Sequence, residues 1–350
     1  MNSTPPPMQG GPDLVGSIDS FRQDFDAVRG EVGKMIVGYR DQVEKVLIGL
    51  VVGGNVLLES VPGLGKTMLV HTLGRVLSLD FRRIQFTADL MPSDIIGTNV
   101  VEEDEAGQRS LHFQRGPLFT HLLLADEINR ATPRTQSALL EAMEEHTVTV
   151  GRHTHTLDEP FFVMATQNPI EQAGTYPLPA AQLDKFLFKL LLGYPDGNDL
   201  DEIVERTTHD TPPVLQPVAN REKILQMRAI ARNVPAASHV QRYASLLVAA
   251  THPESSHATA LGKRCIRMGS SPRGVLALLA AARVRALLEG RVQVSTDDVR
   301  AMAHVALRHR ISRSFEADSE NINSDQIIDD LLEGVPADSA EVFAGSTASV

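Results

Sequence analysis

Residues 56–67 contain the feature that most constrains this chain: a glycine-bearing turn between a short apolar run and a helix-forming segment. The run at 56–58 has the length of a buried strand, and apolar residues from Met68 onward recur at helical spacing. The turn ends in Gly-Lys-Thr. A strand, a glycine-rich turn and a helix in this order are typical of a phosphate-binding loop. The alternative is a structural turn without a ligand, and each further motif weakens it.

The residue types in this loop suit a nucleoside triphosphate. Glycines let backbone N–H groups converge on phosphate oxygens, and the N-terminus of the next helix adds partial positive charge. Lys66 can reach the β- and γ-phosphates, and the Thr67 hydroxyl can bind Mg²⁺. The residues that we expect to contact ATP here are Val61, Pro62, Gly63, Leu64, Gly65, Lys66, Thr67 and Met68.

The loop departs from the usual pattern at its first position, where Ser60 replaces glycine. Serine has less access to positive φ than glycine, so we expect a slightly different turn. Gly63, Gly65 and the Lys66-Thr67 pair are all retained, which predicts a modified site and not an inactive one.

Composition limits the partner and the compartment. The 350 residues are 42% hydrophobic, enough for a full core and two domains. A net charge of −11 disfavours nucleic acid and anionic membranes as partners. The single cysteine, Cys265, excludes an internal disulfide and fits a reducing compartment. Without a signal peptide pattern or a bilayer-spanning apolar run, we expect a cytoplasmic protein that does not insert into membranes.

Hydrophobic patterning divides the chain into four segments. Residues 1–19 are polar and proline-rich, which predicts a disordered leader. Residues 20–195 alternate apolar strands with helices, which predicts a three-layer αβα fold with a mostly parallel sheet. Residues 199–313 show helical patterns only and predict a second, helical domain. Residues 314–350 carry nine acidic residues and no Lys or Arg, which predicts a solvated tail; within it, residues 327–332 can form a short docking helix.

Two carboxylates end the apolar run at 122–125. Asp126 can hold Mg²⁺ through water opposite Thr67, and Glu127 can orient and polarise an attacking water. Ligands of open α/β sheets bind at the carboxyl ends of strands, where both motifs fall. The alternative is an acidic strand end that only caps the next helix.

Two further polar residues have positions that suit a nucleotide site. Asn168 ends the strand that we expect beside the first one, and it can hydrogen-bond the γ-phosphate or the lytic water. Taken alone, it is better explained by an Asn-Pro turn, which is common. Arg273 opens a helix in the second domain and can reach back to the γ-phosphate, although a lone Arg there is otherwise a solvated surface residue.

The combination of these motifs resembles the MoxR family of AAA+ ATPases. The segments that carry the resemblance are 58–67, 83–87, 116–119, 124–130, 136–145 and 165–172, and the likeness extends from about Phe21 to Arg310. It implies a P-loop αβα nucleotide domain with a C-terminal helical lid. It also implies ATP and Mg²⁺ as cofactors, Lys66 and Thr67 as the Walker A pair, and Asp126 and Glu127 as the Walker B pair.

The resemblance implies further roles and partners. Asn168 would be sensor 1, Arg273 would be sensor 2, and Val37 and Gly38 would contact the adenine side. Predicted hairpins at 100–113 and 148–157 look like the helix-2 insert and the pre-sensor-1 hairpin, which face the pore in family rings. The protein would form a ring with itself, expected to be hexameric. It would act on a protein client with a von Willebrand factor A (VWA) domain partner.

Residues 183–186 read Leu-Asp-Lys-Phe where the family usually has Leu-Asp-Arg-Phe. That arginine is the family's finger into the neighbouring site. Lys185 keeps the charge but lacks the planar fork that grips phosphate in two places. Because an arginine finger can supply on the order of 10³ or more in rate, we hypothesise slow intrinsic turnover or dependence on a partner.

The sequence therefore predicts a Mg²⁺-dependent ATPase that remodels or matures protein complexes as a MoxR-type chaperone. Two alternatives stay open. An ATP-dependent scaffold with negligible turnover is favoured by Ser60 and Lys185. A DNA-handling AAA+ motor is disfavoured by the acidic composition.

Overall fold

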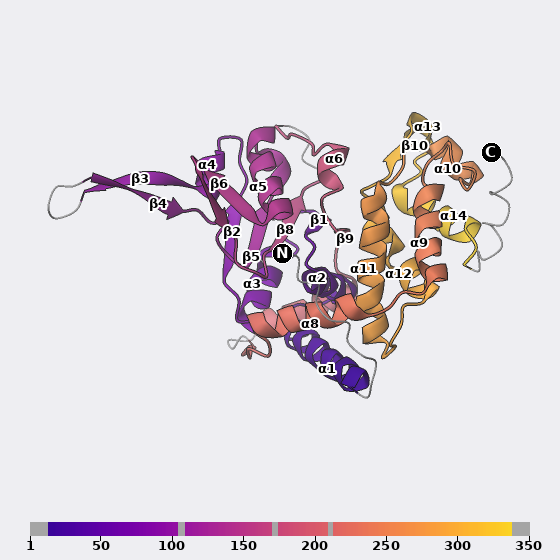
Figure 1. The fold of residues 1–350 in the computed structure, drawn as a ribbon, viewed down its shortest axis with the longest axis horizontal. Helices are drawn as coiled ribbons and strands as arrows, with labels where there is room; N and C mark the ends of the chain where they lie inside the picture. The colour runs from indigo at the N-terminus through magenta and orange to yellow at the C-terminus, as the bar shows by residue number, and fades with distance from the viewer. Residues whose placement is uncertain (1–12, 104–108, 170–173, 209–212, 338–350) are drawn as a thin grey trace, which may run out of the picture.

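The computed structural model describes residues 13–103, 109–169, 174–208 and 213–337. Figure 1 shows an α/β part built from the first half of the chain and a helical part built from the second half. The structure therefore has the predicted sheet domain and the predicted helical lid.

A single parallel sheet forms the centre of the α/β part. Its strand order is β2-β5-β8-β1-β9, and every pair in it is parallel. The strands are β1 (Val56–Ser60), β2 (Phe81–Gln85), β5 (Leu122–Asp126), β8 (Phe162–Gln167) and β9 (Phe188–Leu192). The strand before Asn168 lies beside the first strand, as predicted. All of β5 is buried, because helices cover both faces of the sheet.

Alternate residues of the strands contribute to two separate cores, one on each face of the sheet. Leu58 packs in one core and Leu57 in the other. The first core includes α1 (Asp13–Gly33), α2 (Arg40–Val52) and α3 (Lys66–Val76). The second includes α4 (Pro92–Ile96), the 3₁₀ turn η1 (Ile128–Arg130), α5 (Pro133–Glu145) and, at its edge, α6 (Ala180–Leu183). This two-sided burial confirms the three-layer prediction.

Helix α1 begins before the predicted start of the domain. It starts at Asp13, and Ile18 is only 4% exposed within the first core. Ile18 extends the three-and-four spacing of Phe21 and Phe25, so the same apolar stripe continues toward the N-terminus. The leader boundary predicted at residue 19 is therefore wrong; residues 1–12 lie outside the described residues.

Two hairpins emerge from the same end of the α/β part. Strands β3 (Gly97–Glu103) and β4 (Arg109–Arg115) form a long arm that projects away from the body (Figure 1). Strands β6 (Thr147–Val150) and β7 (His153–Thr156) form a shorter one. The Phe113 and His155 rings stack with centroids 4.2 Å apart, so the hairpins support each other at their bases. Both predicted hairpins are present, and the first is longer than predicted.

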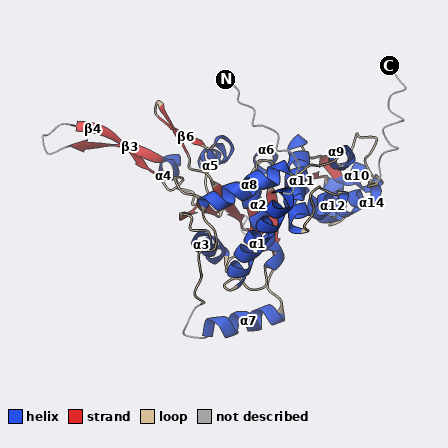
Figure 2. Ribbon diagram, turned by 60° about the horizontal axis from the view of Figure 1, so that its bottom comes forward, coloured by secondary structure: helices blue, strands red, loops and turns tan. Residues whose placement is uncertain are grey.

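The lid contains one small sheet besides its helices. Strands β10 (Ile266–Met268) and β11 (Ser312–Arg313) pair antiparallel. The sequence pattern predicted only helices in this domain, so these strands were missed. The lid helices are α8 (Arg221–Asn233), α9 (Ser238–Ala250), α10 (Ala260–Cys265), α11 (Pro272–Leu288), α12 (Thr296–Leu307), α13 (Phe315–Ser319) and α14 (Ser324–Gly334). Helix α7 (Gly197–Thr208) precedes them and stands apart from the body in Figure 2.

Helix α14 corrects the predicted boundary of the acidic tail. Ile327, Ile328 and Leu331 are fully buried against the lid, and Asn323 caps the helix with Gln326 in a capping box. The docking helix predicted at 327–332 is therefore present. A solvated tail starting at residue 314 is wrong, because the lid continues to at least residue 335 through this apolar face.

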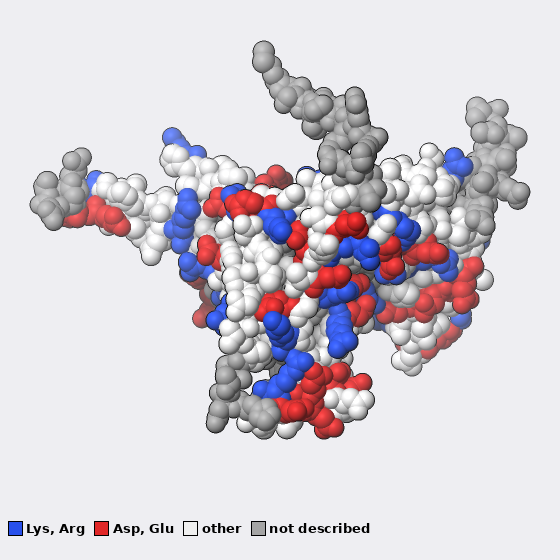
Figure 3. All heavy atoms as spheres, turned by 90° about the horizontal axis from the view of Figure 1, so that it is seen from below, with Lys and Arg blue, Asp and Glu red and all other residues white. Residues whose placement is uncertain are grey.

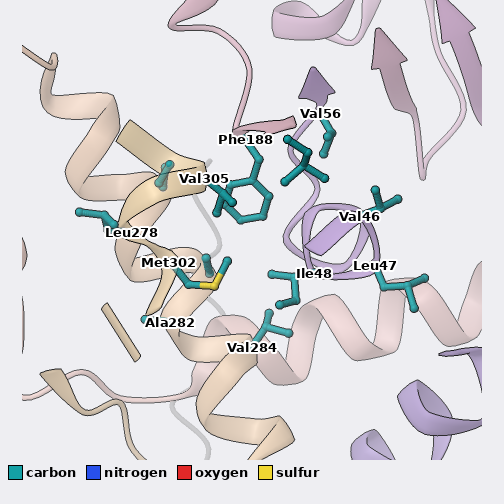
Figure 4. Packing of buried hydrophobic residues seen from close by; sticks show 14 of the residues in the cluster. Val46, Leu47, Ile48, Val56, Phe188, Leu278, Ala282, Val284, Met302 and Val305 are labelled. Atoms are coloured by element: carbon teal, nitrogen blue, oxygen red, sulfur yellow. The ribbon is translucent and has the colours of Figure 1, made fainter. Parts of the chain in front are cut away.

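The sheet and the lid share one continuous core (Figure 4). The residues labelled there are Val46, Leu47 and Ile48 of α2, Val56 of β1, Phe188 of β9, Leu278, Ala282 and Val284 of α11, and Met302 and Val305 of α12. Because these side chains pack together, the lid is anchored on the edge of the sheet near β1 and β9. Within the described parts of the chain, no helix is both long enough and apolar enough to cross a bilayer.

Candidate nucleotide site

The loop after β1 has the backbone of a phosphate-binding turn. Its positive-φ positions are Gly63 (φ +87°) and Gly65 (φ +72°), and Gly65 is the N-cap of α3. Ser60 is the last residue of β1, and its Oγ donates to the carbonyl of Val61 at 3.2 Å. Since the positive φ values fall on the retained glycines, serine at the first position costs the loop no conformational freedom.

The loop and the two carboxylates face one cavity of about 280 Å³. It is lined by residues 62–68, by Arg83 and Gln85 of β2, and by Asp126 and Glu127. Lys66 is buried at 9% exposure, whereas Thr67 is exposed at the cavity. A hydroxyl and a carboxylate are oxygen ligands of the kind that Mg²⁺ prefers, so the donor set fits that ion. The predicted meeting of these motifs at the carboxyl edge of the sheet is thus observed.

Thr166 of β8 fixes the orientation of both carboxylate residues. Its fully buried Oγ1 donates to Asp126 Oδ1 at 2.6 Å and accepts from the backbone N–H of Glu127 at 2.8 Å. Glu127 adopts φ +56°, which is uncommon outside glycine and is found mainly where the surroundings enforce it. Thr166 therefore holds the strand end in the shape that points both acids at the cavity.

A hydrogen-bond chain across β2 links the two carboxylates. Arg83 NH2 donates to Asp126 Oδ2 and to Gln85 Oε1, each at 2.7 Å. Gln85 Nε2 donates to Glu127 Oε2 at 2.8 Å, and Arg130 NH1 donates to the same oxygen at 3.0 Å. Arg83, Gln85, Arg130 and Thr166 were not among the residues predicted for the site. The alternation along β2 was the available signal, since it places Arg83 and Gln85 on one face.

An apolar cavity of about 670 Å³ adjoins the loop and has the size of a small-molecule site. Val37, Leu192 and Ile203 line it, together with residues 62–66 and Met68. Gly38 lines the next cavity with φ +79°, and a Cβ there would lie 2.5 Å from Asp199 Oδ2. Val37 therefore lies beside the loop, Gly38 lines only the second cavity, and Val61 lies outside the lining of both; contact of Val37 and Gly38 with adenine remains a prediction.

Asn168 is buried directly after β8, at the same edge of the sheet as Asp126. Its side chain is 5% exposed and lies outside the lining of the phosphate cavity. This position agrees with a residue near the γ-phosphate, and its role remains a prediction.

Arg273 is at the opposite end of the sheet from the loop. It pairs with Glu144 at the end of α5, and Lys185 Nζ lies 2.8 Å from Glu144 Oε2. All three line a cavity with Gly54 and Asn55, which precede β1, whereas the loop follows β1. The five residues of β1 span about 16 Å. The expected reach of Arg273 to the γ-phosphate of its own subunit is therefore wrong for this conformation.

Arg310 joins the Lys185 segment to the lid. Its Nε donates to Asp184 Oδ1 at 2.9 Å, and its NH2 donates to the Phe186 carbonyl at 2.7 Å. Asp184 Oδ2 also accepts from Ser271 Oγ at 2.8 Å, and Ser271 is the N-cap of the helix that carries Arg273. Burial lowers the pKa of Arg310 to about 10, which leaves it charged at neutral pH. Hydrogen bonds through Asp184 thus connect the segment that carries Lys185 to the helix that carries Arg273.

The surface charge shows no basic region suited to DNA on the face seen in Figure 3. There, Lys and Arg side chains are interleaved with Asp and Glu across the described residues. Binding to the DNA backbone requires clustered Lys and Arg, and on this face the two signs of charge are mixed; the absence of a nucleic-acid partner remains a prediction.

Comparison with known proteins identifies both parts of the chain. Residues 55–188 match the model of the ATPase family associated with various cellular activities (AAA), and residues 258–331 match the AAA lid domain. Chaperone MoxR1 of Mycobacterium tuberculosis is 42% identical over 305 residues, which cover 87% of this chain and 80% of that protein. The uncharacterized protein YeaC of Bacillus subtilis is 41% identical over 321 residues, covering 90% of this chain and 97% of that protein. A crystal structure from Cytophaga hutchinsonii, described as a candidate ATPase, superposes with a TM-score of 0.85 at 38% identity, covering 92% of this chain and 97% of that one.

Proposed function

The chain belongs to the MoxR family of AAA+ ATPases, and from this we propose that it binds ATP with Mg²⁺ between the loop and Asp126 and hydrolyses it to ADP and phosphate. The observation that carries the proposal is the convergence of Lys66, Thr67, Asp126 and Glu127 on one cavity at the carboxyl edge of the sheet. The adjoining apolar cavity supplies a place for the nucleoside.

Each side chain has a defined task in this proposal. Lys66 and the backbone N–H groups of the loop bind the phosphates, and Thr67 and Asp126 hold the metal ion. Bound Mg²⁺ supplies charge neutralisation at the β- and γ-phosphate oxygens. Glu127 orients the attacking water, and Asn168 assists it. Because Gln85 and Arg130 both donate to Glu127 Oε2, that oxygen must leave these partners before it can bind water.

We propose that Lys185 and Arg273 act on the nucleotide of a neighbouring subunit in a ring. Both lie at the amino edge of the sheet, away from the loop of their own subunit. Lys185 supplies an ammonium group and Arg273 a guanidinium. Arg273 can therefore form the paired hydrogen bonds to phosphate that a lysine at position 185 cannot form. This arrangement supports turnover by the assembled ring and slow turnover by the isolated chain.

We further propose that the ring remodels a protein client in the cytoplasm, with a VWA-domain protein as partner. A relative that is 42% identical is named as a chaperone, which supports the general role. The β3–β4 arm carries two exposed apolar side chains, Val101 at 64% and Leu111 at 71% exposure, which suit contact with a non-native chain. The VWA partner rests on the family resemblance.

The test compares four proteins by ATP binding and by single-turnover hydrolysis. We expect Lys66→Ala to lose ATP binding, and Glu127→Gln to bind ATP while its hydrolysis falls by about 100-fold or more. Glu141→Gln, an exposed position on α5, is the charge-matched control and should behave like the wild type.

The same data separate the alternatives. Wild-type protein that binds ATP but hydrolyses it no faster than Glu127→Gln would favour the scaffold with negligible turnover. Salt-dependent binding to DNA would favour the DNA-handling motor. If ATP and Mg²⁺ do not bind the wild type at all, the proposed function fails.

A further inference from the structure

Asp126, the proposed magnesium ligand, already has a cationic partner within the chain. Arg83 NH2 and Nε lie 2.7 Å and 3.2 Å from Asp126 Oδ2, while Oδ1 accepts the hydrogen bond of Thr166. The Asp126 side chain is only 10% exposed. Because an unpaired carboxylate with so little access to water is costly, Arg83 stabilises its charge.

The position of Arg83 makes this pairing exchangeable. Its side chain is 45% exposed, and it lines the same cavity as the loop and Asp126. A pair that is partly open to water is weak enough for a competing cation to break. The displaced guanidinium would remain in a cavity that binds phosphates, where arginine forms bidentate hydrogen bonds.

We propose that Arg83 is a positioning residue that occupies Asp126 Oδ2 until a metal–nucleotide complex displaces it, and that it thereby keeps free divalent cations out of the site. This inference rests on the proposed function, since it concerns the same Asp126 carboxylate. The metal ion then enters only with a triphosphate, which offers Arg83 a new anionic partner.

The same displacement is coupled to Glu127. One atom, Arg83 NH2, donates to both Asp126 Oδ2 and Gln85 Oε1, and the amide nitrogen of Gln85 donates to Glu127 Oε2. When Arg83 leaves Asp126, Gln85 loses the hydrogen bond that orients its amide. The arrival of the metal–nucleotide complex thereby weakens one of the two hydrogen bonds that Glu127 Oε2 accepts, on the residue proposed to orient water.

The test is a titration of the nucleotide-free full chain with Mn²⁺ alone, followed by electron paramagnetic resonance, because the signal of free Mn²⁺ reports binding without any turnover. We expect Arg83→Gln to bind Mn²⁺ at least about tenfold more tightly than the wild type, the size of one charge-assisted hydrogen bond. The gain should vanish in Arg83→Gln with Asp126→Asn. Arg82→Gln removes the same charge from the adjacent, exposed residue of β2 and should leave the affinity unchanged.

A second variant keeps the test decisive if Arg83→Gln does not fold. Arg83→Lys keeps the charge but offers one nitrogen in place of the two, Nε and Nη2, that both donate to Asp126 Oδ2, so its affinity for Mn²⁺ should lie between those of the wild type and Arg83→Gln. Equal affinities in the wild type and in the Arg83 variants, or a gain that survives Asp126→Asn, would overturn the inference. If the wild type binds Mn²⁺ in the presence of ATP, the proposed function stands whatever the Arg83 variants show. If the wild type does not bind Mn²⁺ even with ATP, the proposed function is overturned.

Discussion

The Nζ atom of Lys185 lies 2.8 Å from Glu144 Oε2, at the amino edge of the sheet and far from the phosphate loop of the same chain. Arg273 of the lid pairs with the same carboxylate. Hydrogen bonds from Lys185 and from Arg273 hold the pKa of Glu144 below its ordinary value. The carboxylate thus brings together two cations from different domains, and neither faces the nucleotide site of its own subunit.

If these cations act between subunits, two inactive variants should restore each other. Lys66→Ala lacks a functional loop, and Lys185→Ala with Arg273→Ala lacks the cations; each alone should lose at least about 100-fold in steady-state ATP hydrolysis. In mixed rings, some interfaces combine an intact loop with intact cations. We expect activity to reappear on mixing, as measured by phosphate release against mixing ratio.

The control for this experiment is a mixture of Lys66→Ala with Glu127→Gln. Both substitutions fall in the same cavity, so no interface in that mixture has a complete loop side. Recovery in the control, or none in the first mixture, would contradict action between subunits.

Thr166→Val should weaken both stability and hydrolysis. Valine has nearly the same shape, but it removes the buried hydrogen bonds to Asp126 Oδ1 and to the N–H of Glu127. We expect a loss of about 1–3 kcal/mol in the free energy of unfolding. The rate should fall at least about tenfold, because the two acids lose their fixed orientation. Denaturant titration and ATPase assays measure the two effects; Thr98→Val, at an exposed position of β3, should change neither.

His309 should make the fold less stable in mild acid. Its ring is buried and Nε2 lies 2.9 Å from the Phe186 carbonyl. Burial, together with the nearby charge of Arg310, places its pKa well below the usual 6.5. Below about pH 6.5, His309 is protonated in the unfolded chain but stays neutral in the folded chain. The free energy of unfolding therefore decreases as the pH falls.

The slope of this loss approaches about 1.4 kcal/mol per pH unit for a single group. His309→Gln should flatten the slope in urea titrations below that pH, whereas His239→Gln on the exposed face of α9 should leave it unchanged. An unaltered slope in His309→Gln would show that other groups dominate.

Leu331→Ala should destabilise the lid, because Leu331 lies in the docking helix that the acidic segment contributes to the lid core. Leu331 is fully buried in the core, so the deletion should cost about 2–5 kcal/mol in unfolding free energy. Phe315→Ala in the same segment is the control, because Phe315 is 86% exposed and its loss should cost little. Similar effects of both substitutions in denaturant titrations would contradict the docked position of α14.

Local patterns allowed the sheet and most of the nucleotide site to be predicted. The short apolar run before Asp126 indicates a buried strand, and Gly-Lys-Thr after another such run indicates a phosphate-binding loop at the same edge of the sheet. Boundaries were predicted less well where one or two residues decide them. Ile18 continues the stripe of α1, and two apolar pairs in an acidic segment were enough to dock α14.

The partners of the site residues could not be predicted, because they depend on which strands and helices become neighbours. Arg83 reaches Asp126 only because β2 pairs with β5, a relationship absent from either segment alone. The position of Arg273 depends on how the lid docks beside β9. A motif gives a residue its identity, whereas the sheet order and the lid orientation decide which active site it can reach.

Arg310 adds hydrogen bonds to the Lys185 segment beside the core that the sheet and the lid already share. Because Arg310 and Ser271 both hydrogen-bond Asp184, a rotation of the lid would move the Lys185 segment with it. If the lid of one protomer tilts, the Lys185 and Arg273 side chains at the proposed interface with the next protomer would therefore move with it. In the proposed ring, this coupling would make the nucleotide site of one subunit sensitive to the lid position of its neighbour.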